Sequence, residues 1–263
     1  MLFNSLQFIF YFPIVVALYF MLNHKYRWIM LLLASYYFYM CWNYKYVVLI
    51  LFTTTVNYFA GMGIGTTKSR FRKNLYLVLG VSSSLAVLFF FKYFNFFGDS
   101  INTLFAQFNI FYEIPAYHVL LPVGISFYTF QTLSYTIDIY FGREKIEYHF
   151  GIFALFVSFF PQLVAGPIER SIHLLPQFKR ENKLKYSNVR DGLVFIIWGY
   201  FKKVVIADRL SEYVNIVYND PTSYGGWHNI IATLFFTFQI YCDFSGYSDI
   251  AIGTAKTLGI DLM

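Results

Sequence analysis

Long apolar runs separated by short polar loops dominate the chain. Most of these runs are close to the roughly 20 residues that a helix needs to cross a bilayer. They cover residues 6–22, 28–42, 46–64, 75–97, 119–141, 150–166 and 230–252. The run 28–42 is short, so it needs flanking residues to span. Since the first run has neither a basic leader nor a small-residue cleavage site, we expect a span and not a signal peptide. The pattern predicts an all-α, polytopic integral membrane protein.

Two further segments do not fit a simple span. Residues 192–201 are apolar but too few to cross, and Lys202 and Lys203 follow them directly. We therefore expect a re-entrant or interfacial helix over residues 191–210, with a tilted span and snorkelling lysines as the alternative. Residues 101–111 predict an amphipathic surface helix. Since no internal repeat or long linker is visible, residues 1–263 are predicted to form a single integral-membrane domain.

Several polar residues interrupt the last apolar run. On a helix Gln239, Asp243 and Tyr247 share one face, because they are spaced by four. Ser245 and Asp249 lie nearly opposite. A carboxylate in hydrocarbon costs about 3 kcal/mol on insertion scales, so it usually faces other helices or a wet cavity. We expect this helix either to lie among other helices or to break near residues 245–246. Its polar groups either join helices or line a reaction chamber.

A second polar stripe lies in the run 119–141. Its members recur at helical spacing on one face, and they are Tyr128, Gln131, Thr132, Tyr135 and Asp138. These side chains either bond neighbouring helices or line the same chamber, and Asp138 lies close to the helix end.

A third unusual stretch covers residues 160–170. Pro161, Gly166 and Pro167 end an apolar run sharply. The adjacent Glu169 and Arg170 then read as an ion pair where the chain leaves the bilayer.

Composition agrees with a membrane protein. Apolar residues make up 58% of the chain and charged residues only 13%, and the mean hydropathy is +0.52, which is outside the range of soluble domains. The net charge of +6 comes from basic residues in short loops, a pattern of membrane orientation and not of a nucleic-acid-binding face. Cys41 and Cys242 lie in apolar runs and suggest neither a disulfide framework nor a metal site.

The distribution of Lys and Arg predicts the orientation. Loops 23–27 and 65–74 together hold six basic residues, whereas loops 43–45 and 98–118 hold only Lys45. The bias places the first pair in the cytoplasm and the N-terminus outside. The loop 167–190 is also basic, although three apolar runs separate it from 65–74, so simple alternation fails there. Broken elements are tolerated only where they line an enclosed cavity, so this failure favours a chamber.

Three segments resemble successive signatures of the membrane-bound O-acyltransferase family. They are residues 162–168, Gln-Leu-Val-Ala-Gly-Pro-Ile; residues 201–208, Phe-Lys-Lys-Val-Val-Ile-Ala-Asp; and residues 241–253, Tyr-Cys-Asp-Phe-Ser-Gly-Tyr-Ser-Asp-Ile-Ala-Ile-Gly. The branch is that of alginate O-acetyltransferase and its peptidoglycan-acetylating relatives. The opening residues 1–22 also fit, and the resemblance covers the whole chain.

The resemblance implies a multi-helix bundle around a central funnel in the bacterial cytoplasmic membrane. It implies a cytoplasmic acyl donor, acetyl-CoA or an acyl carrier, as co-substrate, and no bound cofactor. The acceptor would be an extracytoplasmic cell-surface polysaccharide, reached by way of a partner acyltransferase protein. The residues expected to line the funnel are Gln239, Asp243, Ser245, Tyr247, Asp249, Tyr128, Gln131 and Asp138. The family-motif residues are Gly166, Pro167, Glu169, Arg170, Lys202 and Lys203.

The chain departs from the family pattern at its end. Family members continue past this point to a Trp-His-Ile-Ser-like stretch and a further histidine, and we expect the catalytic histidine to lie beyond Met263. The chain would then be C-terminally incomplete and inactive alone. Its own histidines are expected to be loop residues, and they are His24, His118, His149, His173 and His228. Two alternatives stay open: a transporter or channel that uses the intramembrane carboxylates, and a non-catalytic membrane scaffold.

Overall fold

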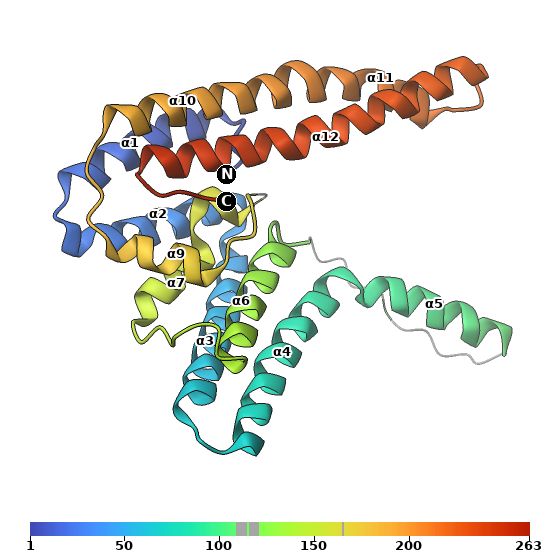
Figure 1. The fold of residues 1–263 in the computed structure, drawn as a ribbon. Helices are drawn as coiled ribbons and strands as arrows, with labels where there is room; N and C mark the ends of the chain where they lie inside the picture. Colours follow the sequence, from blue (N-terminus) through green and yellow to red (C-terminus); the bar gives the residue numbers. More distant parts are fainter. Residues whose placement is uncertain (109–114, 116–120, 165) are drawn as a thin grey trace. The chain divides into compact units, whose positions relative to one another are not determined.

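The computed structural model describes residues 1–108, 115, 121–164 and 166–263. Within them every regular element is a helix (Figure 1), so the all-α prediction is confirmed. The chain forms two compact units. Unit 1 comprises Met1–Tyr44 and Ser158–Met263, and unit 2 comprises Lys45–Val157.

Unit 1 is built around a long helical hairpin. Its elements are α1 (Leu6–Met21), α2 (His24–Asn43), α8 (Phe160–Leu163), α9 (Ser171–Lys179), α10 (Tyr186–Tyr200), the π-helix η2 (Phe201–Ala207), α11 (Asp208–Asn219) and α12 (Gly226–Thr257). The elements α10, η2 and α11 follow one another without a break, and all three pack along α12 (Figure 1). With 32 residues, α12 is about 48 Å long, more than the roughly 30 Å of a hydrocarbon core.

A short turn joins the two arms of this hairpin. The Asp220 carboxylate accepts hydrogen bonds from the hydroxyls of Ser223 and Thr222, the latter at 2.9 Å. These bonds, that of Ser223 first, hold the pKa of the exposed Asp220 below its usual range.

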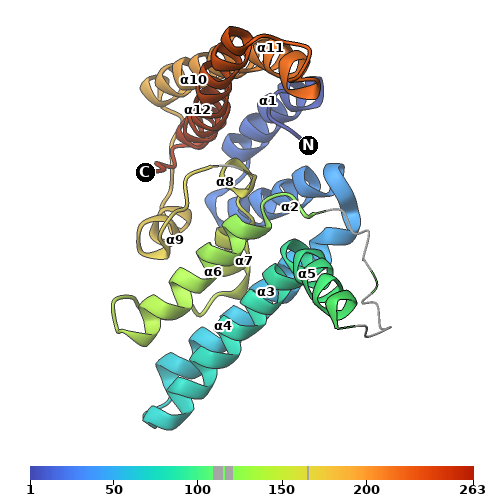
Figure 2. The same cartoon turned by 90° about the vertical axis from the view of Figure 1, so that its right-hand side faces the viewer.

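Unit 2 is a bundle of apolar helices. Its elements are α3 (Val47–Thr66), α4 (Arg70–Lys92), α5 (Phe94–Gln107), α6 (Ile125–Tyr140) and α7 (Phe150–Ser158). The helices α3, α4 and α6 pack against one another (Figure 2). The 3₁₀ turn η1 (Tyr44–Tyr46) precedes α3.

Most of the expected apolar runs are helices with shifted ends. The short run 28–42 gains flanking residues, as expected, and becomes the 20-residue α2. Two helical stretches in the described part of the chain, His24–Thr66 and Arg70–Lys92, are long and apolar enough to cross a membrane, and Leu6–Met21 is a shorter apolar helix. The amphipathic helix expected at 101–111 is part of α5, which begins earlier, and residues 109–111 lie outside the described residues.

The run 150–166 is not the single span that the sequence suggested. It forms α7, with nine residues, and α8, with four. Pro161 explains the break, because it has no N–H to donate and its ring clashes with the carbonyl four residues earlier. At 1.5 Å per residue α7 is about 14 Å long and too short to cross alone.

Candidate site on the α10–α12 hairpin

The backbones of α10 and α12 touch at two pairs of glycines. A Cβ atom on Gly253 would lie 2.4 Å from the carbonyl oxygen of Gly192, and one on Gly199 would lie 2.6 Å from that of Gly246. The two glycines are two turns apart on each helix. Small residues allow such close packing of membrane helices, and here they fix the antiparallel register.

Beyond the second glycine pair, two lysines of η2 meet polar groups of α12. Lys202 Nζ donates to Ser245 Oγ at 2.7 Å and forms an ion pair with Asp249. Lys203 Nζ lies 2.5 Å from Asp243 Oδ1 and 2.9 Å from Asp208 Oδ1. The lysine side chains are only 13% and 14% exposed, so the charges are largely desolvated.

We name Lys202, Lys203, Asp208, Asp243, Ser245 and Asp249 the charge ladder. On α12, Asp243 and Asp249 lie three residues on either side of Gly246. Lys203 therefore meets Asp243 on one side of the glycine contact, and Lys202 meets Asp249 on the other side. The π-helical winding of Phe201–Ala207 accompanies this arrangement, and short π segments in α-helices occur frequently at functional sites.

Aromatic rings and an amide surround the ladder. Lys202 Nζ lies 5.8 Å from the centroid of the Trp198 ring, and Lys203 Nζ lies 5.4 Å from that of Tyr247. Both distances suit cation–π attraction. One turn before Asp243, Gln239 Oε1 is buried without a hydrogen-bond partner among the described residues. These groups add two aromatic contacts and a buried amide to the charge ladder.

Of the two alternatives for the last apolar run, the first holds. The helix α12 is continuous through residues 245–246 and packs against α10, η2 and α11, and Lys202 and Lys203 of η2 meet both of its polar flanks. The helix expected over 191–210 is present but longer, because Lys202 and Lys203 lie in the middle of a helical run over 186–219, where their ammonium groups are paired with carboxylates. That this helix is re-entrant or interfacial stays a prediction.

The polar stripe of α6 joins elements of unit 2. Tyr128, Gln131 and Tyr135 are buried. Gln131 Nε2 donates to the carbonyl oxygen of Phe156 at 2.8 Å, and the Tyr135 hydroxyl accepts from the Glu147 N–H at 3.0 Å. These contacts are of the kind that holds helices together.

The last member of the stripe, Asp138, lies near the end of α6. It is 8% exposed, and its carboxylate is 3.7 Å from Arg143. The stripe and the charge ladder belong to different units, so a common funnel remains a prediction.

Sequence reasoning missed a polar cluster in unit 2. Asn57 Nδ2 donates to Ser84 Oγ at 2.8 Å, and Thr136 Oγ1 donates to Asn57 Oδ1 at 2.9 Å. All three side chains are fully buried and come from three different helices. The sequence did contain a signal for this cluster: Asn57 lies in the middle of the apolar run 46–64, and a buried amide needs hydrogen-bond partners.

The motif turn 166–170 also differs from the prediction. Glu169 does not form an interfacial ion pair with Arg170: it is fully buried, and its Oε2 lies 3.1 Å from His173 Nδ1, whereas Arg170 is exposed. Pro167 is half-buried, and Gly166 is required for close packing. A Cβ atom on Gly166 would lie 2.4 Å from Gln162 Cα.

The histidines differ in their surroundings. The expectation that they lie in loops is wrong for His173, which lies in α9, and also for His24 and His228, which lie in the first turns of α2 and α12. His149 precedes α7 and its Nδ1 accepts from the Ile152 N–H at 3.2 Å, and His228 lies in the first turn of α12. His24 begins α2, and His118 lies outside the described residues. In the described part of the chain, no group of three His, Cys, Asp or Glu side chains could hold a metal ion.

Comparison with known proteins decides the family. Residues 145–263 match the model of the membrane-bound O-acyltransferase family, MBOAT. This match includes all three motif segments and the charge ladder. By this match residues 145–263 belong to the membrane-bound O-acyltransferase family.

Curated relatives of bacterial origin extend the similarity over the whole chain. The chain is 39% identical over 267 residues to the probable alginate O-acetylase AlgI of Pseudomonas aeruginosa. The alignment covers 100% of this chain and 50% of that protein. It is 36% identical over 294 residues to the peptidoglycan O-acetyltransferase of Helicobacter pylori, covering 100% and 55%. The teichoic acid D-alanyltransferase of Streptococcus thermophilus is 30% identical over 152 residues, covering 52% and 34%.

The chain spans about half the length of the O-acetylating relatives that it matches. Family and relatives together identify it as a bacterial membrane protein, and members of this family use an acyl donor as co-substrate.

Proposed function

We propose that this chain forms part of an enzyme that transfers an acetyl group from a cytoplasmic donor to a cell-surface polysaccharide outside the membrane. The observation that carries the proposal is the assembly of all three motif segments in unit 1. The segment 162–168 begins within α8, which packs on α12. The segments 201–208 and 241–253 are joined through the charge ladder. The acceptor class is supported by relatives named for alginate and peptidoglycan.

The chemistry would be acyl transfer. A histidine acts as base or relay, and positioned dipoles stabilise the tetrahedral oxyanion. The Asp243 and Asp249 carboxylates already contact ammonium groups, so neither is a free proton acceptor in this arrangement. Their proposed role is to hold α12 in register beside the reaction chamber, and the base is the family histidine expected beyond Met263.

The proposal includes an orientation and a set of partners. The N-terminus is extracytoplasmic, and the basic loops 23–27 and 65–74 face the cytoplasm of a bacterial inner membrane. Acetyl-CoA or an acyl carrier supplies the acetyl group on that side. A partner acyltransferase protein completes the transfer to the polysaccharide.

The test uses the complete protein in inverted membrane vesicles. Labelled acetyl-CoA and, separately, an acetyl-loaded acyl carrier are added outside the vesicles, where the cytoplasmic face is exposed, and a cell-surface polysaccharide is enclosed in the lumen as acceptor. We expect label to appear on the polysaccharide only in vesicles that contain the protein. Ion flux without any acyl transfer would instead support a transporter and overturn the proposal.

A further inference from the structure

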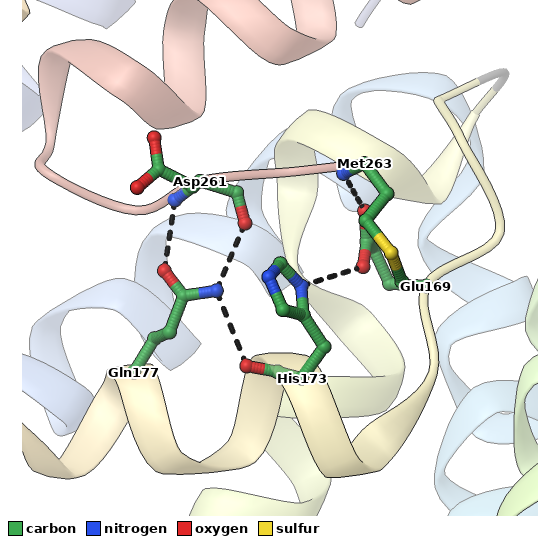
Figure 3. A network of polar contacts seen from close by, with 5 residues as sticks. All are labelled: Glu169, His173, Gln177, Asp261 and Met263. Carbon is green, nitrogen blue, oxygen red and sulfur yellow. Dashed lines mark hydrogen bonds and ion pairs between the residues drawn. The ribbon is translucent and has the colours of Figure 1, made fainter.

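A polar face of α9 meets the segment that follows α12. Glu169, His173 and Gln177 are spaced by four residues, so they share one side of the helix and of the turn before it. Figure 3 shows Gln177 directed toward Asp261, Glu169 toward Met263, and the His173 ring between them and in contact with Glu169. These five residues come from two regions of the chain that are far apart in sequence.

Gln177 binds both backbone groups of one residue. Its Oε1 accepts from the Asp261 N–H at 2.8 Å, and its Nε2 donates to the Asp261 carbonyl oxygen at 2.9 Å. The same Nε2 lies 3.2 Å from the carbonyl oxygen of His173. The side-chain amide therefore acts on Asp261 as a neighbouring strand would, and this contact does not depend on the side chain at 261.

Glu169 provides the second anchor. Its carboxylate is fully buried. One oxygen accepts from the Met263 N–H, and the other contacts His173 Nδ1 at 3.1 Å. A buried carboxylate is costly unless it is paired and hydrogen-bonded, and here each of its oxygens has a partner. His173 thus holds the carboxylate in the orientation that receives Met263.

The end of α12 aims the chain at these anchors. Gly259 has φ +80°, and its N–H donates to the Lys256 carbonyl oxygen at 2.9 Å, while the Ile260 N–H donates to that of Ala255 at 3.0 Å. This pair of bonds is the Schellman motif that ends helices at a left-handed glycine. Ile260 is fully buried directly after the turn, so the path from α12 to Asp261 is fixed on both sides.

We infer that the Glu169–His173–Gln177 face is a docking strip for residues 259–263, and that Glu169 and Gln177 position the start of the chain that follows in a protein as long as the relatives. The inference rests on the proposed function, because the catalytic histidine is expected further along that chain. Anchoring by alternate residues, Asp261 and Met263, holds the segment extended and sets its direction. Glu169 and Gln177 act on the reaction through this placement and not by contact with the substrate.

The experiment compares variants of the complete protein. Gln177→Ala removes both hydrogen bonds to Asp261. Glu169→Gln replaces one carboxylate oxygen by an NH2 group, which cannot accept from the Met263 N–H. The matched control is Ile172→Ala, also in α9 but with a side chain that is 56% exposed. Backbone hydrogen exchange of residues 260–263 and the kcat and KM of acetyl transfer are measured for each protein.

We expect exchange at residues 260–263 to become at least tenfold faster in both test variants. We expect kcat to fall about tenfold with the KM for the donor unchanged, because placement and not donor binding is lost. Ile172→Ala should stay within twofold of the parent in both measurements. Unchanged exchange in both variants would overturn the docking strip, and faster exchange with an unchanged kcat would overturn the positioning role.

A covalent tether separates positioning from general loss of structure. In a Cys41→Ser background, cysteines replace Gln177 and Asp261 and are joined by a short bismaleimide. We expect the joined protein to recover the kcat that the unjoined cysteine pair has lost, and no recovery would count against positioning. Failure of the proposed function would be recognised separately, as absence of transfer in the unsubstituted protein, while the exchange measurement would still test docking.

Discussion

The two lysines of the charge ladder have unequal sets of partners. Lys203 contacts two carboxylates, Asp208 and Asp243, whereas Lys202 contacts one carboxylate, Asp249, and the hydroxyl of Ser245. Removing one member of a buried ion pair leaves an uncompensated charge, and the cost depends on what else that charge can reach. Asp249 is also the more buried of the two α12 carboxylates, with 16% exposed against 44% for Asp243.

The unequal partners predict an order of stability. Asp249→Ala should lower the free energy of unfolding by about 3 kcal/mol, because Lys202 keeps only a neutral partner in a dry site. Asp243→Ala should cost less, because Lys203 keeps Asp208 and the lost side chain was half hydrated. Thermal unfolding in one detergent compares the two variants. A larger loss for Asp243→Ala would contradict the assigned pairing.

The same pairing predicts a rescue. The double variant Lys202→Asp with Asp249→Lys restores an ion pair of opposite polarity, so it should recover part of the stability that Asp249→Ala loses. If the double variant is less stable than both Lys202→Asp and Asp249→Lys, the Lys202 ammonium is held in the parent by Ser245 and not by the Asp249 carboxylate.

At the scale of elements, the hairpin shows what the sequence can and cannot predict. The apolar runs predicted the ends of α1 and α3 to within two residues and those of α2 to within four, because helix formation and burial leave a local pattern. The partner of Asp243 is not local: it depends on the register that the glycine pairs impose on α10 and α12. The Glu169–His173 contact has the helical i,i+4 spacing and was readable, but the bond from Met263 joins positions 94 residues apart.

The glycine contacts make the register testable. Gly199→Ala places a methyl group 2.6 Å from the Gly246 carbonyl oxygen, and a backbone cannot yield cheaply. We expect a loss of about 1–3 kcal/mol, the usual cost of overpacking, together with weaker lysine contacts. The matched control is Gly226→Ala in the first turn of α12, where nothing lies within 4 Å of the added Cβ. Equal unfolding temperatures for the two variants would refute the close approach.

At the scale of the whole molecule, the chain holds two compact units but matches only about half the length of its O-acetylating relatives. The distribution of Lys and Arg predicts how the chain crosses the bilayer. Most of the basic residues of loops 23–27 and 65–74 lie in the first turns of two apolar helices, Lys25 and Arg27 in α2 and Arg70, Arg72 and Lys73 in α4, and basic residues close to the ends of spans are those that set orientation.

Cysteine labelling tests that orientation. In a Cys41→Ser background, Thr67→Cys should react with a membrane-impermeant maleimide only after the cytoplasmic side is opened. Asn102→Cys should react in intact cells. The physical reason is the excess of basic residues in loop 65–74 over loop 98–118. Labelling of position 67 from outside would reverse the predicted topology.

The last prediction concerns residues 1–263 on their own, which we expect to have no acetyltransferase activity. Acyl transfer in this family is expected to need a histidine that lies further along the chain. Within the described residues His173 is bound to Glu169, and His149 caps a helix. The measurement incubates the purified fragment with labelled acetyl-CoA and polysaccharide, beside a protein extended to the length of the relatives. Turnover by the fragment that disappears in His173→Asn would place the base in α9 and would turn the docking strip into the catalytic site.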